Sequence, residues 1–351
     1  MKRIFSLSGV IALLIAGAAV MQADNGHGTL VVTATNATAN QLLVYNTGGT
    51  LIQTVSTGGK GGVSGNAGGI AASGSEVAVV NFGSQSVSVF ERSRNGLRLT
   101  ETIYTASSPV SVAFGANHLY ILGTKTVESH AMHQWQDNSS VEIYADGLTN
   151  LVLGDGSAAQ VGVVTNGLVI SEKSNMIETV GLTGQGAVTG AATAVTNIPG
   201  NVNAPFGMAT RGNNAYVTIA HADEISLVRN GAVLTTTPTS SFSGPLQHAP
   251  CWVALDGPYL FSANSPSMSI SRWVVYGQNI VADAGVVATL NGAPTDIASK
   301  HGLVAVIDGN GPVTHLSIFN ADEDGNLTLL QPATTVSGTM NGVAIVEAQQ
   351  N

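Results

Sequence analysis

The chain is short of cysteine and short of charge. Its single cysteine, Cys251, cannot form an internal disulfide, so a fold stabilised by disulfides within the chain is excluded. Only 9% of its residues are charged, and 12 basic residues stand against 21 acidic ones. Nucleic acids and anionic membranes bind clustered Lys and Arg. We therefore expect neither of them as a partner.

Familiar catalytic and cofactor motifs are also missing. No Gly-x-Ser-x-Gly nucleophile motif is present. The glycine-rich run 58–62 contains Lys60 but lacks the Ser or Thr that follows Gly-Lys in a phosphate-binding loop. The acidic stretch 321–326 lacks the closing Glu of a calcium loop and falls at an expected hairpin turn. Cys251, beside Trp252 in an apolar segment, reads as a small core residue. We expect no cofactor and no metal.

The N-terminus has the pattern of a secretory signal. Met1, Lys2 and Arg3 precede a largely apolar run from Ile4 to Val20, which is short for a membrane span. Residues 1–23 are expected to be removed, with Ala19 as an alternative cleavage position to Ala23. A retained membrane anchor is the other interpretation. Export without disulfides predicts a secreted or periplasmic bacterial protein with no membrane contact once the signal is gone.

What the chain has in abundance is repetition. A short apolar phrase with a small second residue recurs seven times, at 70–71, 112–113, 161–162, 208–209, 253–254, 297–298 and 343–344. The copies lie roughly 45 residues apart, and repeats of this length built from short strands are typical of β-propellers. We call the second residue of each pair the anchor. The repeat predicts an all-β, seven-bladed β-propeller over residues 28–347.

Each repeat also predicts four strands. In the second blade, alternating segments at 76–80, 86–90 and 97–104 follow the anchor segment 69–72, with a turn at Asn95-Gly96. The two ends of the chain are complementary, because 30–34 begins a blade without an anchor segment and 342–346 is an anchor segment with nothing after it. We expect the C-terminal strand to complete the first blade and close the ring.

The ends of the second strands predict a polar ring at one mouth of the central channel. Counting about ten residues past an anchor reaches Asn81, Gly123, Glu172, Asn264 and Asp308, and in the fifth blade, with a longer turn, His221. The first blade supplies Asn36, and the polar members of this set form the predicted ring. Asn and Asp are also common in hairpin loops, so a purely structural role is the alternative for each. Glu172, Lys173 and His221 are different, because they titrate and are not typical turn formers. We expect these three to be catalytic, and the ring's Asn36, Asn81, Asn264 and Asp308 to bind a ligand.

One connection is longer than its counterparts. Residues 125–138 read as an insertion that carries His130, His133, Trp135 and Asp137. Long loops on rigid scaffolds often hold functional residues. A metal site here has weak support, since His130, His133 and Asp137 lack a rigid spacing motif. We predict instead that the insertion is a lid over the channel and that His130 and His133 contact the ligand.

Four stretches carry a family resemblance. They are 160–161 leading into 168–175, Pro205-Phe206-Gly207, 249–253, and 294–298. Together they resemble the secreted lactonase-like seven-bladed propellers, often labelled 3-carboxymuconate cyclase-like. The resemblance implies a fold shared with 6-phosphogluconolactonase and carboxymuconate-lactonising enzymes, which act on anionic lactones or muconates at the channel mouth.

The chain also departs from that family. Anionic substrates call for arginine, yet the six arginines that follow the signal region are all expected away from the ring, and Lys125 and Lys173 are the nearest cations. Asn66-Ala67-Gly68-Gly69 replaces the Leu-x-Ser-Gln-Gly phrase of the relatives. Two functions therefore stay open: a lactonase or lactonising cyclase acting on a small lactone or carboxylate, and a non-enzymatic propeller that binds a small molecule or a protein.

Overall fold

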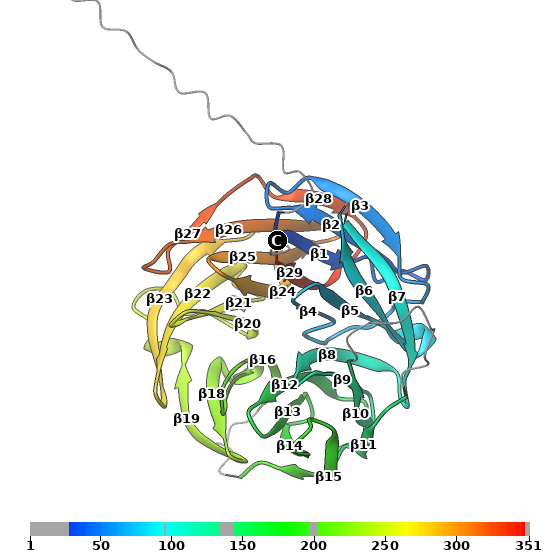
Figure 1. Ribbon diagram of the computed structural model, residues 1–351. Helices are drawn as coiled ribbons and strands as arrows, with labels where there is room; N and C mark the ends of the chain where they lie inside the picture. Colours follow the sequence, from blue (N-terminus) through cyan, green and yellow to red (C-terminus); the bar gives the residue numbers. More distant parts are fainter. Residues whose placement is uncertain (1–27, 95, 133–143, 197–202, 348–351) are drawn as a thin grey trace, which may run out of the picture.

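The computed structural model describes residues 28–94, 96–132, 144–196 and 203–347. These residues form seven antiparallel sheets arranged as blades around a central axis (Figure 1). The fold is therefore the seven-bladed β-propeller that the repeat predicts. The predicted signal, residues 1–23, lies outside the described residues.

The first four blades are regular four-stranded sheets. Blade 1 consists of β29 (Asn341–Val346), β1 (Leu30–Ala34), β2 (Gln41–Asn46) and β3 (Leu51–Ser56). Blade 2 consists of β4 (Ile70–Ser73), β5 (Glu76–Asn81), β6 (Ser86–Ser93) and β7 (Gly96–Tyr104). Blade 3 consists of β8 (Pro109–Gly115), β9 (His118–Gly123), β10 (Thr126–Ala131) and β11 (Gly147–Asn150). Blade 4 consists of β12 (Ala158–Val164), β13 (Gly167–Glu172), β14 (Met176–Leu182) and β15 (Val188–Ala194).

The remaining blades follow the same order. Blade 5 consists of β16 (Pro205–Arg211), β17 (Asn214–Ile219), β18 (Glu224–Arg229) and β19 (Ala232–Pro238). Blade 6 consists of β20 (Pro250–Asp256), β21 (Tyr259–Asn264), β22 (Ser269–Tyr276) and β23 (Asn279–Thr289). Blade 7 consists of β24 (Ala293–Lys300), β25 (Leu303–Asn310), β26 (Val313–Ala321) and β27 (Leu327–Leu329), with β28 (Thr334–Ser337) as a second partner of β26. Within the described residues, three short 3-10 helices lie in connections: Phe82–Ser84, Ala220–Ala222 and Thr239–Ser241.

The core lies between neighbouring blades, because each sheet buries both of its faces. In β9 all six residues are buried, and in β21 only the first is partly exposed. Trp273 of blade 6 is fully buried, and its ring packs against Phe242 with 4.4 Å between the ring centroids. Such two-sided burial explains why the second strands are nearly continuous apolar runs.

The C-terminal strand closes the ring as expected. β29 pairs antiparallel with β1, and the register places Val31 opposite Ile345 and Val32 opposite Ala344. Val343, Ala344, Ile345 and Val346 are all buried. Blade 1 is therefore assembled from both ends of the propeller, and β1 is paired on both of its edges, with β29 and with β2.

Candidate functional site: the central channel

The wall of the central channel is made by the edges of the seven inner strands. Each of β4, β8, β12, β16, β20, β24 and β29 pairs on one side only, with the second strand of its own blade. Its other edge faces the axis. Since N–H and C=O groups alternate along a strand edge, every second residue directs both groups into the channel. The channel wall is therefore rich in backbone hydrogen-bonding groups even though many of its side chains are apolar.

One mouth of this channel is covered by residues 63–69, which we call the plug. The plug ends the connection between blades 1 and 2. The Asn66 side chain donates to the Val110 carbonyl of blade 3 at 2.6 Å, and its Oδ1 accepts from Asn341 of blade 1 at 2.8 Å. Trp252 of blade 6 donates from Nε1 to the Asn66 carbonyl at 3.1 Å. The plug is thus held from three blades that lie around the mouth.

Further contacts tie the plug to blades 4 and 5. The Ala67 N–H donates to the Ala159 carbonyl at 3.1 Å, and Lys173 Nζ donates to the Gly65 carbonyl at 2.6 Å. Ala67 is buried in an apolar cluster that includes Phe206 and Trp252. Gly68 has a φ of +63°, and a Cβ at this position would meet Ser111 Oγ at 3.0 Å. Glycine at 68 therefore allows the backbone to lie this deep in the mouth.

The residue two positions before the anchor links its blade to the next one. The Ser111 hydroxyl accepts from the Val161 N–H at 3.3 Å. Gln160 accepts from the Met208 N–H at 2.6 Å and donates to the Met208 carbonyl at 3.1 Å. These side chains satisfy edge groups that would otherwise be unpaired at the start of the inner strands.

Asp296 occupies the same position in blade 7. One carboxylate oxygen accepts from the Ile297 N–H at 2.9 Å and the other from the Val343 N–H of blade 1 at 3.2 Å. The side chain is only 5% exposed. Burial raises the pKa of Asp296 to about 7, although the hydrogen bonds from Ile297, Val343 and Gly68 act in the opposite direction. Asp296 is therefore a carboxyl group that changes charge near neutral pH.

Beneath the plug lies a cavity of about 480 Å³. Ala67, Gly68, Gln160, Trp252 and Asp296 line it at the plugged end, and the inner strands of all seven blades contribute to its wall. Lys300 lines the other end, where its Nζ lies 3.1 Å from the carboxylate of Glu347. Asp296 and Lys300 lie four residues apart on one strand, or roughly 13 Å. The cavity contains a titratable acid at its closed end and a neutralised cation at the other.

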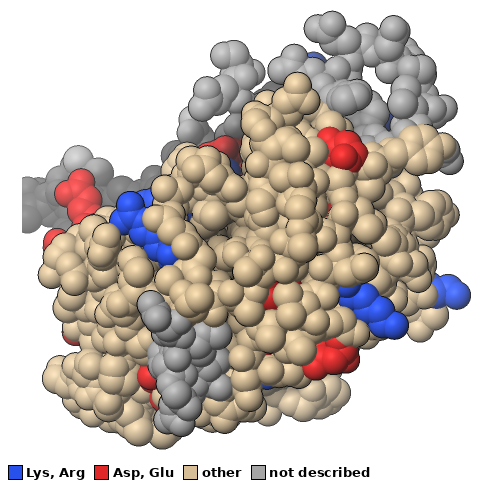
Figure 2. Space-filling view, turned by 90° about the horizontal axis from the view of Figure 1, so that it is seen from below, with Lys and Arg blue, Asp and Glu red and all other residues tan. Residues whose placement is uncertain are grey.

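Arginine does not line this cavity. The surface seen from the side has few charges: in Figure 2 the Lys and Arg side chains stand apart from one another on a mostly uncharged surface. Within the described ranges, His, Cys, Asp and Glu form no group of three or more that could hold a metal ion. No helix in the part of the chain that the structure describes has the length and apolar character needed to cross a membrane.

Two residues of the predicted ring, Asn81 and Asn264, are completely buried. Asn81 accepts from Asn40 at 3.0 Å and from Thr57 at 2.8 Å, and it donates to Ser88 at 2.7 Å. Asn264 has a comparable set of partners, the hydroxyls of Ser262, Ser269 and Ser271. Both side-chain amides therefore form their hydrogen bonds with other residues of the protein.

Glu172 and Lys173 lie at the top of blade 4, on the plugged face. Glu172 is completely buried at the end of β13, and burial together with the charges of Glu178 and Asp155 raises its pKa to about 8. Burial lowers the pKa of Lys173, whose Nζ contacts the plug at Gly65. Neither residue lines the channel cavity, so their catalytic role stays a prediction.

The other ring residues are dispersed. Asn36 has a φ of +53° and accepts from the N–H groups of Gly62 and Val63, so it holds the connection that leads into the plug. Asp308 is completely buried and accepts from His315 Nδ1 at 2.8 Å. His221 is exposed in a 3-10 turn of blade 5. None of the three lines the cavity.

The interpretation of residues 125–138 as a single inserted loop is wrong for its first half. Thr126–Ala131 form β10, the third strand of blade 3, and pair with both β9 and β11. His130 is 2% exposed, and its Nε2 lies 3.4 Å from Glu128 Oε1 inside the blade. The strand was hard to recognise, because Val127 is the only large apolar residue of Thr126–Ala131 and three polar residues follow it in succession. His133, Trp135 and Asp137 lie outside the described residues.

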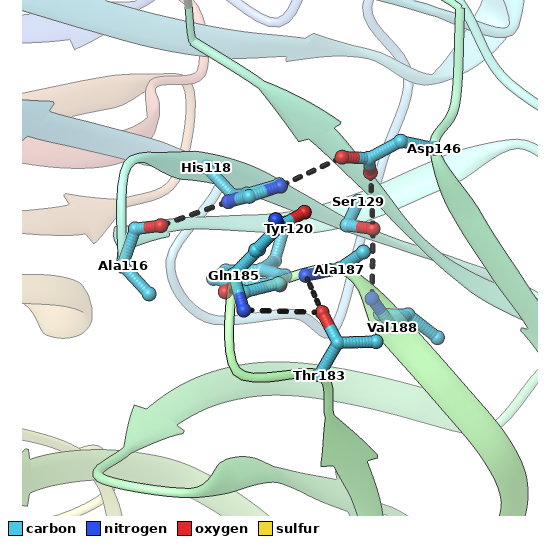
Figure 3. A network of polar contacts seen from close by, with 10 residues as sticks. Ala116, His118, Tyr120, Ser129, Asp146, Thr183, Gln185, Ala187 and Val188 are labelled. Carbon is cyan, nitrogen blue, oxygen red and sulfur yellow. Dashed lines mark hydrogen bonds and ion pairs between the residues drawn. The ribbon is translucent and has the colours of Figure 1, made fainter.

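Blade 3 also contains a Ser, an Asp and a His in contact, which sequence reasoning did not bring together (Figure 3). Asp146 accepts from Ser129 at 2.7 Å and contacts His118 Nε2 at 2.7 Å, while His118 Nδ1 contacts the Ala116 carbonyl at 2.8 Å. Ser129 contacts the acid instead of the imidazole, and its oxygen accepts from the Val188 N–H of blade 4. A serine nucleophile needs the histidine as its base, so this network serves to join blades 3 and 4.

Comparison with solved structures supports the fold. No protein-family profile matches the chain, and no curated protein matches its sequence. A candidate 6-phosphogluconolactonase from Bacteroides fragilis aligns over 93% of this chain and 99% of its own, with 14% identity and a TM-score of 0.63. Another from Bacteroides uniformis aligns over 92% and 100%, with 14% identity and a TM-score of 0.64. The chain has the fold of the lactonase-like seven-bladed propellers.

The same fold also occurs in a different kind of enzyme. Virginiamycin B lyase from Staphylococcus aureus aligns over 81% of this chain and 92% of its own, with 14% identity and a TM-score of 0.55. At these identities the likeness concerns the fold, and the activity has to be argued from the site. Sequence reasoning missed the roles of Gln160 and Asp296, which lie two residues before an anchor, and of Asn66, which lies five residues before one. Aligning the seven repeats on their anchors would have identified the position two residues before each anchor.

Proposed function

We propose that this lactonase-like propeller hydrolyses a small, uncharged lactone inside the central channel, with Asp296 as the general base. The observation that carries the proposal is the position of Asp296, a carboxyl group with a pKa of about 7 at the closed end of a cavity of about 480 Å³. A general base works best when its pKa is close to the working pH. The fold shared with the candidate 6-phosphogluconolactonases supports the substrate class.

The reaction needs three things from the protein. Asp296 takes a proton from water as the water oxygen attacks the lactone carbonyl and forms a tetrahedral intermediate. The ring C–O bond then breaks, and the leaving ring oxygen takes the proton back from Asp296, which gives a hydroxy acid and restores the carboxylate. Inner-strand N–H groups that face the axis are candidates to stabilise the oxyanion, because backbone donors fixed in place serve this role well. The walls exclude bulk water from the closed end.

The charge of the cavity argues for an uncharged substrate. A phosphorylated or polycarboxylate lactone requires arginine forks or several lysines, whereas Lys300 is paired with Glu347 and arginine does not line the cavity. The proposed substrate therefore differs from the anionic lactones and muconates that the family resemblance implies. In this proposal the protein works outside the cytoplasm, in keeping with the N-terminal sequence, and its partner is a small molecule.

Binding without turnover is the second candidate function. It is favoured by the hydrogen bonds at the closed end, where the side-chain donors of Gln160 and Trp252 are already engaged by the protein. Catalysis requires interactions that form in the transition state and not with the bound substrate. Donors that already bond to the protein are not free to form such interactions. The channel would then hold a small polar ligand without changing it.

A lactone panel separates these functions. Uncharged γ- and δ-lactones and 6-phosphogluconolactone are assayed with the wild type and with Asp296→Asn, Glu172→Gln and His221→Ala. We expect turnover of uncharged lactones, a loss of at least about 100-fold in Asp296→Asn, and near wild-type rates in the other two. Asp308→Asn is the matched control, since Asp308 is also a buried acid of blade 7 but does not line the cavity.

Each other outcome assigns the function differently. Turnover that is lost in Glu172→Gln or His221→Ala but kept in Asp296→Asn places catalysis at the predicted ring. Absence of turnover with the whole panel, together with lactone binding measured by calorimetry, supports the binding function.

A further inference from the structure

The two ends of the channel cavity differ in their covering. At the plugged end the lining residues Ala67, Ile70, Val112 and Val343 are buried. At the other end the lining residues are partly exposed, and they stand next to the turns that join the first and second strands: Ala72, Phe114, Val163, Thr210, Leu255 and Lys300. Exposure of the cavity wall therefore increases from the plug toward these turns.

The plug is built as a fixed cover. Its residues accept or donate hydrogen bonds at 2.6 to 3.1 Å with blades 1, 3, 4 and 6, and Gly68 also donates to Asp296 of blade 7. Ala67 adds apolar packing against Phe206 and Trp252. Removing the plug would leave the Trp252 indole N–H and the Asn341 amide without the partners they have on Asn66. A cover with this many partners does not open readily.

We infer that the channel is a blind pocket, closed by the plug at 63–69 and entered only from the face that carries the turns between first and second strands. This inference deepens the proposed function, on which it rests for the chemistry of the ligand. It assigns substrate access to the face opposite the ring that the sequence predicts. It also selects for a compact molecule, since a polymer cannot pass through a channel with one closed end.

The residues of the open mouth then become the specificity determinants. Phe114, Thr210 and Leu255 surround the mouth with neutral side chains. Lys300 and His301 both contact Glu347, at 3.1 Å each. The pairing with Glu347 offsets the charge of Lys300, so the mouth favours an uncharged ligand over an anion.

Cysteine accessibility tests the route without any turnover. In a Cys251→Ser background, Ala113→Cys places a thiol on the cavity wall, and its rate of reaction with methyl methanethiosulfonate is measured. Ala298→Cys on blade 7 is a second reporter, in case the first variant folds poorly. Thr210→Trp narrows the open mouth, and Ser64→Trp adds the same bulk to an exposed position of the plug.

We expect both reporters to react, Thr210→Trp to slow the reaction at least tenfold, and Ser64→Trp to change it less than twofold. Slowing by Ser64→Trp but not by Thr210→Trp would overturn the inference, because access would then run past the plug. Reporters that fail to react in folded protein also overturn it, since the cavity would be closed at both ends. These rates of cysteine modification do not depend on whether Asp296 is catalytic. The access route and the proposed function can therefore be refuted independently.

Discussion

Burial and the carboxylate of Glu178 on the neighbouring strand of blade 4 together raise the pKa of Glu172. The two acids sit diagonally across β13 and β14, where Ile170 pairs with Glu178 and Glu172 pairs with Met176. Glu178 accepts the N–H groups of Val152 and Leu153, both at 3.0 Å. Glu172, with its pKa raised to about 8, is the protonated acid of the pair near neutral pH.

This pair predicts a pH-dependent cost to stability. A carboxyl group whose pKa is raised by folding binds more protons in the folded state, so stability falls as the pH rises from the ordinary value near 4.5 to about 8. Glu172→Gln removes this effect. We expect the difference in unfolding free energy between the variant and the wild type to favour the variant by a few kcal/mol more at pH 9 than at pH 4. Melting temperatures at the two pH values measure the difference.

Glu178→Gln is the matched control for that experiment. Its amide has only one accepting oxygen, so the N–H group of Val152 or Leu153 loses its partner, and we expect destabilisation of about 1–3 kcal/mol at pH 4. The loss should be smaller at pH 9, because the variant also removes the charge that opposes ionisation of Glu172. An equal effect of Glu172→Gln at pH 4 and pH 9 would show that Glu172 has an ordinary pKa.

The fold could be read from the sequence because the repeat constrains it strongly. Seven anchors specify seven inner strands. The segment 30–34 lacks an anchor strand before it and 342–346 is an anchor strand with nothing after it, which already implied that the two segments pair. The candidate site was harder to find, because the counting rule pointed at the ends of second strands such as Asn81 and Asn264. Those side chains turn toward neighbouring strands within and between blades and are satisfied there.

The plug could not be deduced from local pattern at all. Residues 63–69 have no strand periodicity, and their position depends on contacts with Val110, Trp252 and Asn341, which come from three distant parts of the chain. Only the replacement of the relatives' phrase by Asn66-Ala67-Gly68-Gly69 marked the segment as unusual. Long-range contacts of this kind are not encoded in the spacing of neighbouring residues.

Ring closure predicts a large effect of a small truncation. Deletion of 342–351 removes most of β29. It exposes the edge of β1 that pairs with β29, together with the apolar core of blade 1. Val343, Ile345 and Val346 are buried, and each such side chain contributes about 1.5–3 kcal/mol. We expect a loss of at least about 5 kcal/mol in urea unfolding. Deletion of 348–351 alone is the control, and equal stability of the two truncated proteins would contradict closure by β29.

The bond between Gln160 and Met208 predicts a smaller, local effect. Gln160→Leu keeps the size of the side chain but leaves the Met208 N–H and C=O groups of blade 5 unpaired. We expect destabilisation of about 1–3 kcal/mol, because an unsatisfied buried group is more costly than a lost exposed bond. Gln185→Leu, at an exposed turn of blade 4, serves as the control and should change stability by less than about 0.5 kcal/mol.

Asp296 predicts the pH profile of the proposed reaction. A general base acts in its charged form, so lactone turnover should rise with pH and level off above the pKa of about 7. Initial rates between pH 5 and pH 9 measure the profile. Asp296→Asn should remove the titration along with the activity, whereas Glu172→Gln should leave the midpoint in place. A midpoint near 8 that disappears in Glu172→Gln would assign the reaction to Glu172 instead.

We expect the thiol of Cys251 to be nearly unreactive in the folded protein. Burial, with a further contribution from the charge of Asp223, raises its pKa to about 12, and the thiolate is the reactive form of cysteine. At pH 8 only about one thiol in ten thousand is ionised, so a disulfide reagent such as dithiobisnitrobenzoate should label the folded protein at least 100-fold more slowly than the urea-unfolded chain. Asp223→Asn removes the nearby charge and should speed the labelling, while Asp256→Asn on the same blade as Cys251 should not. Rapid labelling of the folded wild type would place Cys251 in an environment more open than the one that packs it against the Trp252 cluster.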